Sequence, residues 1–123
     1  MNDFSFAGCK ILIVEDDFLQ GADLAQMLKD EGATVIGPAV DLASAFEALN
    51  AQPQLAVLDL RLGQELSLPI ADELSRRGVP FIFSAALPEQ IPFCYGDVPV
   101  CEKPATHAEM RTLLAVAMQR TSA

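Results

Sequence analysis

Residues 10–17 carry the sequence Lys-Ile-Leu-Ile-Val-Glu-Asp-Asp, in which four branched apolar residues run directly into three acidic ones. A short run of consecutive apolar residues is typical of a strand that is buried on both faces. The acidic residues follow where this strand should end and a helix should begin. Because neighbouring carboxylates repel one another, we expect a positive charge beside them, and a divalent cation is the first hypothesis.

The rest of the chain alternates between apolar runs and helical periodicity. Four further strands are predicted at residues 34–36, 55–58, 79–83 and 98–101, the first of these ended by Gly37-Pro38. Helices are predicted at residues 18–31, 42–49, 70–77 and 105–119. The predicted buried helix faces include Phe18 in the first of these helices and Phe46 in the second. Residues 60–63 are predicted as a loop.

The segment between the fourth and fifth strands, residues 86–97, contains Pro88 and Pro92. Any helix there must be short or distorted, because proline removes a backbone donor and clashes with the preceding turn. Five strands that alternate with helices predict a parallel sheet with helices on both faces. The expected fold is therefore a flavodoxin-like, doubly wound (βα)5 domain. We expect it to span residues 1–123 with no output domain.

Composition narrows the functional classes. The 123 residues are 51% hydrophobic and 20% charged, as in a globular protein. Acids outnumber bases 17 to 8, which gives a formal charge of −9 and argues against a nucleic-acid partner. The three cysteines show no metal-ligand spacing, and the chain shows no signal peptide and no membrane-spanning apolar run. We expect a cytoplasmic protein with no membrane association.

Functional side chains of open parallel sheets gather beyond the carboxyl ends of the strands. Those ends carry Glu15, Asp16 and Asp17 after the first strand, Asp59 after the third and Lys103 after the fifth. Carboxylates that converge with a lysine form an oxygen-ligand site for a hard cation such as Mg²⁺, next to a cation that suits phosphate.

Each of these residues also has an ordinary structural interpretation. Asp16 or Asp17 could cap the first helix, Asp59 could be a turn residue, and Lys103 could be a solvated charge. Taken singly, these interpretations are favoured. The joint placement of the acids and the lysine after the first, third and fifth strands favours a site instead. Asp17 is expected to start the first helix.

The sequence resembles the receiver domain of two-component response regulators over essentially its whole length. Three motifs carry the resemblance: Lys-Ile-Leu-Ile-Val-Glu-Asp-Asp at 10–17, Leu-Asp-Leu-Arg-Leu-Gly at 58–63 and Glu-Lys-Pro at 102–104. Each motif is weak alone, but their order and spacing together are specific.

The resemblance implies a role for each matching residue. Asp59 would be the phosphoacceptor, and Asp16 and Asp59 would ligate Mg²⁺, or another divalent cation such as Mn²⁺. Glu15 would act on the metal mainly through water, and Arg61 would offer its backbone carbonyl. Lys103 would contact the phosphoryl group, and the bond from Lys103 to Pro104 is often cis in this family. The partners would be a histidine kinase or phosphotransfer protein and an unknown downstream protein.

The sequence departs from the family at the end of the fourth strand. Counted from Pro80, the family's signalling hydroxyl falls on Ala85, and the neighbouring hydroxyl, Ser84, comes one residue early. A one-residue shift turns a side chain to the opposite face of a strand. Either the strand end is rearranged so that Ser84 reaches the site, or the hydroxyl relay is missing, which we favour. The family's switching aromatic would fall on Val100.

These features leave two hypotheses of different classes. The leading one is a stand-alone receiver that acts through protein contacts or as a phosphate sink, with no catalysis beyond its own phosphorylation and dephosphorylation. The alternative is a pseudo-receiver, an interaction module with a phosphorylation-independent switch. An aspartate-based phosphatase is disfavoured because no second Asp follows Asp59 two residues later. A flavin-binding protein is disfavoured because no Ser/Thr/Gly-rich phosphate loop follows the first strand.

Overall fold

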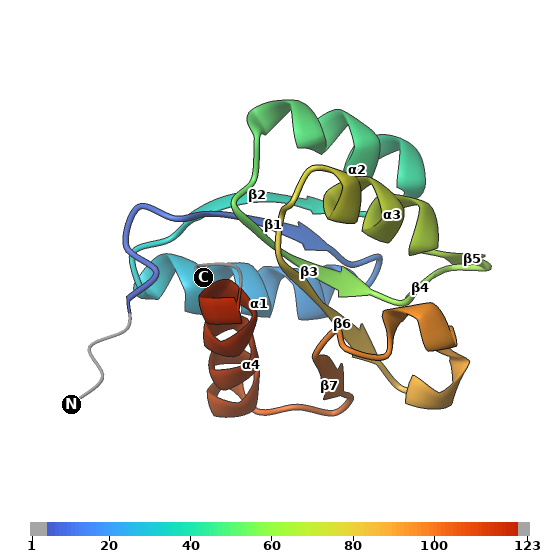
Figure 1. Ribbon diagram of the computed structural model, residues 1–123. Helices are drawn as coiled ribbons and strands as arrows, with labels where there is room; N and C mark the ends of the chain where they lie inside the picture. Colours follow the sequence, from blue (N-terminus) through green and yellow to red (C-terminus); the bar gives the residue numbers. More distant parts are fainter. Residues whose placement is uncertain (1–4, 121–123) are drawn as a thin grey trace.

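A five-stranded parallel sheet forms the centre of the computed structural model, which describes residues 5–120 (Figure 1). Its strands lie in the order β2-β1-β3-β6-β7. Their bounds are β1 (Lys10–Val14), β2 (Thr34–Ala39), β3 (Leu55–Asp59), β6 (Phe81–Ala85) and β7 (Val100–Glu102). The order places β1 and β3 side by side, so the ends of these two strands are adjacent. The predicted doubly wound fold is confirmed.

Helices cover both faces of the sheet (Figure 1). On one face, α1 (Phe18–Asp30) and α4 (His107–Arg120) pack on a core that includes Ile11, Ile13 and Val57. On the other face, α2 (Leu42–Ala48), the short 3₁₀ helix η1 (Leu49–Ala51) and α3 (Leu68–Arg76) enclose a second core. Among residues 5–120, no helix combines the length and the apolar character needed to cross a membrane.

The predicted buried faces of α1 and α2 are wrong at one residue each. Phe18 is 82% exposed, because it opens α1 at the rim of the sheet, beyond the core residues that the later turns cover. Phe46 is 43% exposed, because α2 packs through its neighbour Ala45 and leaves Phe46 at the border of the core. Helical periodicity gives the direction of a side chain but not the extent of the surface beneath it.

Strand β2 does not end at residue 36 as predicted but continues to Ala39. A bulge makes this possible: β2 pairs with β1 at Leu12 and again at Val14, with a register shift between them. Gly37 provides the irregular step with a φ of +94°, and the Gly37–Pro38 peptide bond is cis. The extension places the Ala39 carbonyl where it accepts a 2.8 Å hydrogen bond from the Glu15 amide.

Strands β6 and β7 both begin two residues later than predicted. Apolar character extends over residues 79–80 and 98–99, but a proline nitrogen cannot donate a hydrogen bond to the ladder. Pro80 and Pro99 therefore contribute only their carbonyls, which accept from the amides of Ala56 and Phe83. Strand β6 also ends two residues later than predicted, at Ala85, so residues 84 and 85 lie inside the sheet.

Residues 60–63, predicted as a loop, contain the first strand of a small hairpin. Strands β4 (Arg61–Leu62) and β5 (Glu65–Leu66) pair antiparallel just beyond the end of β3. The prediction missed this hairpin because two-residue strands leave no periodicity to detect.

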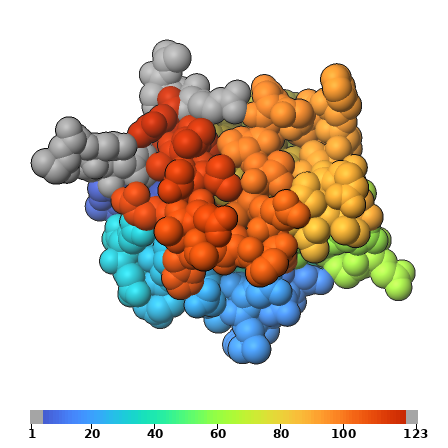
Figure 2. All heavy atoms as spheres, turned by 90° about the horizontal axis from the view of Figure 1, so that it is seen from below, coloured from blue at the N-terminus to red at the C-terminus, as the bar shows by residue number. Residues whose placement is uncertain are grey.

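The segment after β6 forms two 3₁₀ turns, η2 (Pro88–Gln90) and η3 (Phe93–Tyr95), in place of a fourth α-helix. The expected short or distorted element is thus confirmed. The Tyr95 ring anchors the segment, because its centroid lies 5.5 Å from that of Phe83 and 6.3 Å from that of Phe81. Figure 2 shows this segment beside α4 on one face of the molecule.

Candidate functional site

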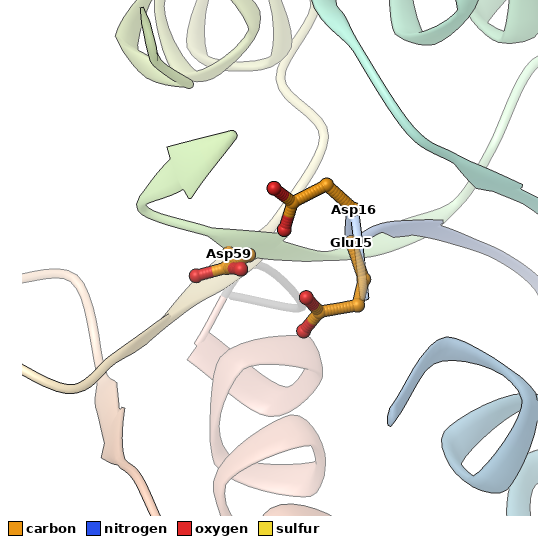
Figure 3. A group of neighbouring side chains, drawn as sticks. All are labelled: Glu15, Asp16 and Asp59. Carbon is orange, nitrogen blue, oxygen red and sulfur yellow. The ribbon is translucent and has the colours of Figure 1, made fainter. Parts of the chain in front are cut away.

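Three acidic side chains meet at the carboxyl edge of the sheet (Figure 3). Asp59 is the last residue of β3, and Glu15 and Asp16 directly follow β1. One carboxylate oxygen from each of the three lies within 4.8 Å of the others. Glu15 and Asp59 are 7% and 8% exposed, whereas Asp16 faces solvent. The pairing of β1 with β3 therefore makes one cluster from residues that are far apart in the sequence.

Lys103 provides the positive charge inside this cluster. Its Nζ lies 3.2 Å from Oδ2 of Asp59 and 3.1 Å from Oε1 of Glu15. The Lys103 backbone amide donates to the carbonyl of Ala85 at 2.9 Å, which fixes the start of this loop against the end of β6. The Lys103–Pro104 peptide bond is cis, as the resemblance implies.

The electrostatics of the cluster favour the uptake of positive charge. Burial, reinforced by the neighbouring Asp59, raises the pKa of Glu15 from 4.5 to about 7, against the opposing effects of the Asp17 amide and Lys103. Burial lowers the pKa of Lys103, but Asp59 and Glu15 together outweigh it and raise that pKa above its usual value. Two buried carboxylates that share one ammonium group remain short of positive charge.

The two remaining acidic positions have separate roles. Oδ2 of Asp16 accepts a 2.7 Å hydrogen bond from the amide of Gly63 and so ties the β4–β5 hairpin to the site. Asp17 caps α1, as predicted, because its side chain accepts from the Gln20 amide at 2.9 Å. The Gly63 contact was not anticipated, since no local sequence signal links residues so far apart.

Ser84 and Ala85 line different cavities. Ser84 borders a cavity of about 470 Å³ between α1 and α4, which is lined by Glu15 and Lys103 as well as by apolar residues such as Leu24 and Met110. Ala85 borders a cavity of about 200 Å³ that is also lined by Asp59 and Lys103. Thus Ala85, and not the hydroxyl of Ser84, adjoins the pocket beside the Asp59 carboxylate.

Arg61 begins β4, two residues after Asp59. Its Nη1 donates to Oε1 of Gln90 in η2 at 3.3 Å, a contact that the sequence did not indicate. The predicted role of the Arg61 carbonyl as a metal ligand stays a prediction.

The donor set of the acidic cluster fits a hard divalent cation. All three side chains offer carboxylate oxygens, the ligands that Mg²⁺ and Mn²⁺ prefer, and no sulfur or nitrogen donor is among them. Glu15 and Asp59 are buried with one ammonium group between them, so a cation would relieve their mutual repulsion.

The curated proteins similar to this chain include the transcriptional regulatory protein PdtaR from two strains of Mycobacterium tuberculosis. Over 83 residues, 66% of this chain, the sequence is 31% identical to the transcriptional regulatory protein PdtaR of Mycobacterium tuberculosis. The match covers 40% of PdtaR, so the chain spans about two fifths of the length of this relative. No protein-family model matches the chain.

Solved structures match nearly the whole chain. SdrG from Sphingomonas melonis Fr1 is 31% identical with a TM-score of 0.80, covering 90% of this chain and 97% of that one. The receiver (REC) domain of the response regulator PhyR from Erythrobacter litoralis has a TM-score of 0.82 at 24% identity, covering 95% of each chain. At that identity, the likeness to PhyR shows the fold alone.

The strand order, together with these likenesses, defines an α/β protein of the flavodoxin-like class. The chain belongs to the receiver-domain family of two-component response regulators, which confirms the resemblance seen in the sequence.

Proposed function

We propose that this receiver domain accepts a phosphoryl group on Asp59 from a histidine kinase or phosphotransfer protein, in a reaction that requires Mg²⁺ or Mn²⁺. It then acts through contacts with a downstream protein or as a phosphate sink. One observation carries the proposal: the Asp59 carboxylate lies against the Lys103 ammonium and within the cluster that includes Glu15 and Asp16.

In the proposed reaction, an Asp59 carboxylate oxygen attacks the phosphorus atom of a phosphohistidine. The phosphorus–nitrogen bond breaks, its electron pair leaves with the imidazole, and an acyl phosphate remains on Asp59. Lys103 reduces the repulsion between two anionic reactants and orients Oδ2, which lies 3.2 Å from its Nζ.

The metal would be held by Glu15, Asp16 and Asp59, with the backbone carbonyl of Arg61 as a further ligand. When bound, a divalent cation supplies positive charge to the phosphoryl oxygens. We propose that the domain turns over no separate substrate and carries out only its own phosphorylation and dephosphorylation. The described cysteines are free, which supports a cytoplasmic location.

The test is incubation of the chain with acetyl phosphate and Mg²⁺, followed by intact mass measurement. Wild type should gain the mass of one phosphoryl group, and Asp59→Asn should gain none. Asp72→Asn is the matched control, because it removes an exposed carboxylate on α3. This control should match wild type. An unmodified wild type, or an equal adduct in Asp59→Asn, would contradict the proposal.

The pseudo-receiver remains the second candidate, and one observation favours it. The pocket beside Asp59 is lined by the methyl groups of Ala85 and Ala86, and among the described residues no side-chain hydroxyl lines it. A wild-type chain that binds Mg²⁺ but takes up no phosphoryl group would support this candidate.

A further inference from the structure

The pocket beside Asp59 has one apolar wall and one wall that can donate hydrogen bonds. Ala85 and Ala86 form part of the apolar wall. Among the described side chains that line the pocket, those of Lys103, Arg61 and Gln90 carry hydrogen-bond donors. Lys103 is already shared between two carboxylates. Among the described residues that line the pocket, a phosphoryl group on Asp59 would therefore find further side-chain donors only in Arg61 and Gln90.

Arg61 has an unusually weak partner for an arginine in this protein. Its guanidinium donates to the neutral amide oxygen of Gln90 at 3.3 Å. In contrast, Arg76, Arg77 and Arg111 each bind a glutamate carboxylate. Within residues 5–120, Arg61 forms no ion pair with a carboxylate. At 3.3 Å the hydrogen bond to Gln90 is longer than the usual range of about 2.7–3.2 Å, and it lacks the attraction between opposite charges, so Arg61 can exchange its partner at little cost.

The charge at the site favours this exchange after phosphorylation. With one divalent cation bound, that cation and Lys103 would balance the three carboxylates of the cluster. An acyl phosphate carries about two negative charges where the Asp59 carboxylate carried one, so the loaded site has an excess negative charge. Arg61 lines the same pocket as Asp59 and carries the one positive charge needed.

We propose that Arg61 is a phosphoryl-binding residue whose guanidinium leaves Gln90 and binds a phosphoryl oxygen once Asp59 is loaded. The inference rests on the proposed phosphorylation of Asp59. Because Gln90 belongs to η2, the exchange removes a contact between β4 and the 3₁₀ segment. The conformation of residues 88–95 then depends on whether Asp59 is phosphorylated, even though Ala85 has no hydroxyl group to relay the signal. The segment carries Phe93, which is 99% exposed, so its rearrangement would change a surface available to other proteins.

The test is NMR spectroscopy of the ¹⁵N-labelled chain before and after treatment with acetyl phosphate and Mg²⁺, with the adduct measured by mass in the same samples. In wild type, the Arg61 Nε–Hε resonance and the amide resonances of residues 88–95 should move together on loading. In Arg61→Gln, the adduct should form while these amides stay unchanged. In Gln90→Ala, the amide resonances of residues 88–95 should lie close to their positions in phosphorylated wild type before any phosphoryl group is added.

Arg76→Gln is the matched control, because it removes an exposed cation at the far end of α3, and it should respond as wild type does. A second readout avoids covalent chemistry: the affinity for beryllofluoride, a tetrahedral phosphoryl analogue, should fall about tenfold in Arg61→Gln and less in Arg61→Lys.

Two outcomes would overturn the inference while the proposed function stands. One is a wild-type adduct with no movement of the Arg61 resonance. The other is an Arg61→Gln adduct with the full wild-type response in residues 88–95. Absence of any wild-type adduct in the mass spectrum would instead remove the proposed function, and this inference with it.

Discussion

Lys103 and Asp59 face each other across an intervening strand. Asp59 ends β3, Lys103 follows β7, and β6 lies between these two strands, yet Nζ and Oδ2 are 3.2 Å apart. The long lysine side chain spans the end of β6 and also reaches Glu15 at 3.1 Å. A single ammonium group thus bridges the carboxylate that follows β1 and the carboxylate that ends β3, at the carboxyl edge of the sheet.

Replacing this ammonium should impair phosphate uptake more than folding. Lys103→Met leaves Glu15 and Asp59 with no cationic partner, so uptake from acetyl phosphate should fall about a hundredfold. The free energy of unfolding in urea should fall by about 1–2 kcal/mol, a value between those typical of surface and buried pairs, because the ion pairs of Lys103 with Glu15 and Asp59 are partly exposed. Lys103→Arg keeps the charge and should retain part of the uptake. Unimpaired uptake in Lys103→Met would show that Lys103 has no role in the reaction.

Glu15 should make the metal-free protein less stable as pH rises. Its pKa is about 7 in the fold and 4.5 otherwise, so the folded state holds the proton more tightly. The resulting stabilisation is complete below pH 4.5 and is lost as pH rises through about 7. At pH 8 without divalent ions, the free energy of unfolding in urea should be higher for Glu15→Gln than for wild type, by on the order of 3 kcal/mol. At pH 4.5 the two should be similar, and equal curves at both pH values would contradict the assigned pKa.

The affinity for Mg²⁺ should depend on pH through the same Glu15 carboxyl group. A cation must displace the proton from Glu15 below pH 7, so Mg²⁺ affinity should fall by up to about tenfold per pH unit there. Isothermal titration calorimetry in buffers of different ionisation enthalpy would detect the released proton. Glu15→Gln should bind Mg²⁺ more weakly but with a flatter pH profile. An unchanged slope in that variant would exclude Glu15 as the group that titrates.

Ser84 and Ala85 should respond differently to substitution. Ala85→Val adds methyl groups to the wall of the pocket beside Asp59, so the initial rate of phosphate uptake should fall about tenfold. Ser84→Ala changes a side chain that lines the cavity between α1 and α4, and the rate should stay as in wild type. A slow Ser84→Ala variant would show that the hydroxyl takes part in the reaction after all.

The bulge in β2 should be intolerant of side chains. A Cβ at Gly37 would lie 2.6 Å from the Ala39 nitrogen and 2.8 Å from the Ile13 carbonyl oxygen, in addition to the strain of a positive φ. Gly37→Ala should therefore destabilise the fold by about 3 kcal/mol in thermal or urea denaturation. Gly78→Ala is the matched control, because Gly78 also has a positive φ but no atom within 4 Å of the added Cβ. The Gly78→Ala substitution should lower the free energy of unfolding by only about 1 kcal/mol.

Prediction from the sequence succeeded for elements that one physical pattern determines. The buried strand β1, the helix cap at Asp17 and the proline-broken segment after β6 each follow from local chemistry. Prediction failed at the bulge of β2 and the β4–β5 hairpin, where pairing partners set the boundaries. It also failed at the starts of β6 and β7, where Pro80 and Pro99 have no amide to donate to the ladder. Phe18 and Phe46 show the same limit, since the exposure of a side chain depends on the surface beneath it.

The sequence by itself determined the sheet and the set of residues at its carboxyl edge, because alternating strands and helices leave few arrangements for a parallel sheet. Only the tertiary structure decided which groups meet there. It brought Glu15, Asp59 and Lys103 to within hydrogen-bonding reach, directed Ser84 and Ala85 into separate cavities, and joined Arg61 to Gln90. The physical reason is that local patterns specify secondary structure and side-chain alternation, whereas distances between remote residues arise from strand register and packing.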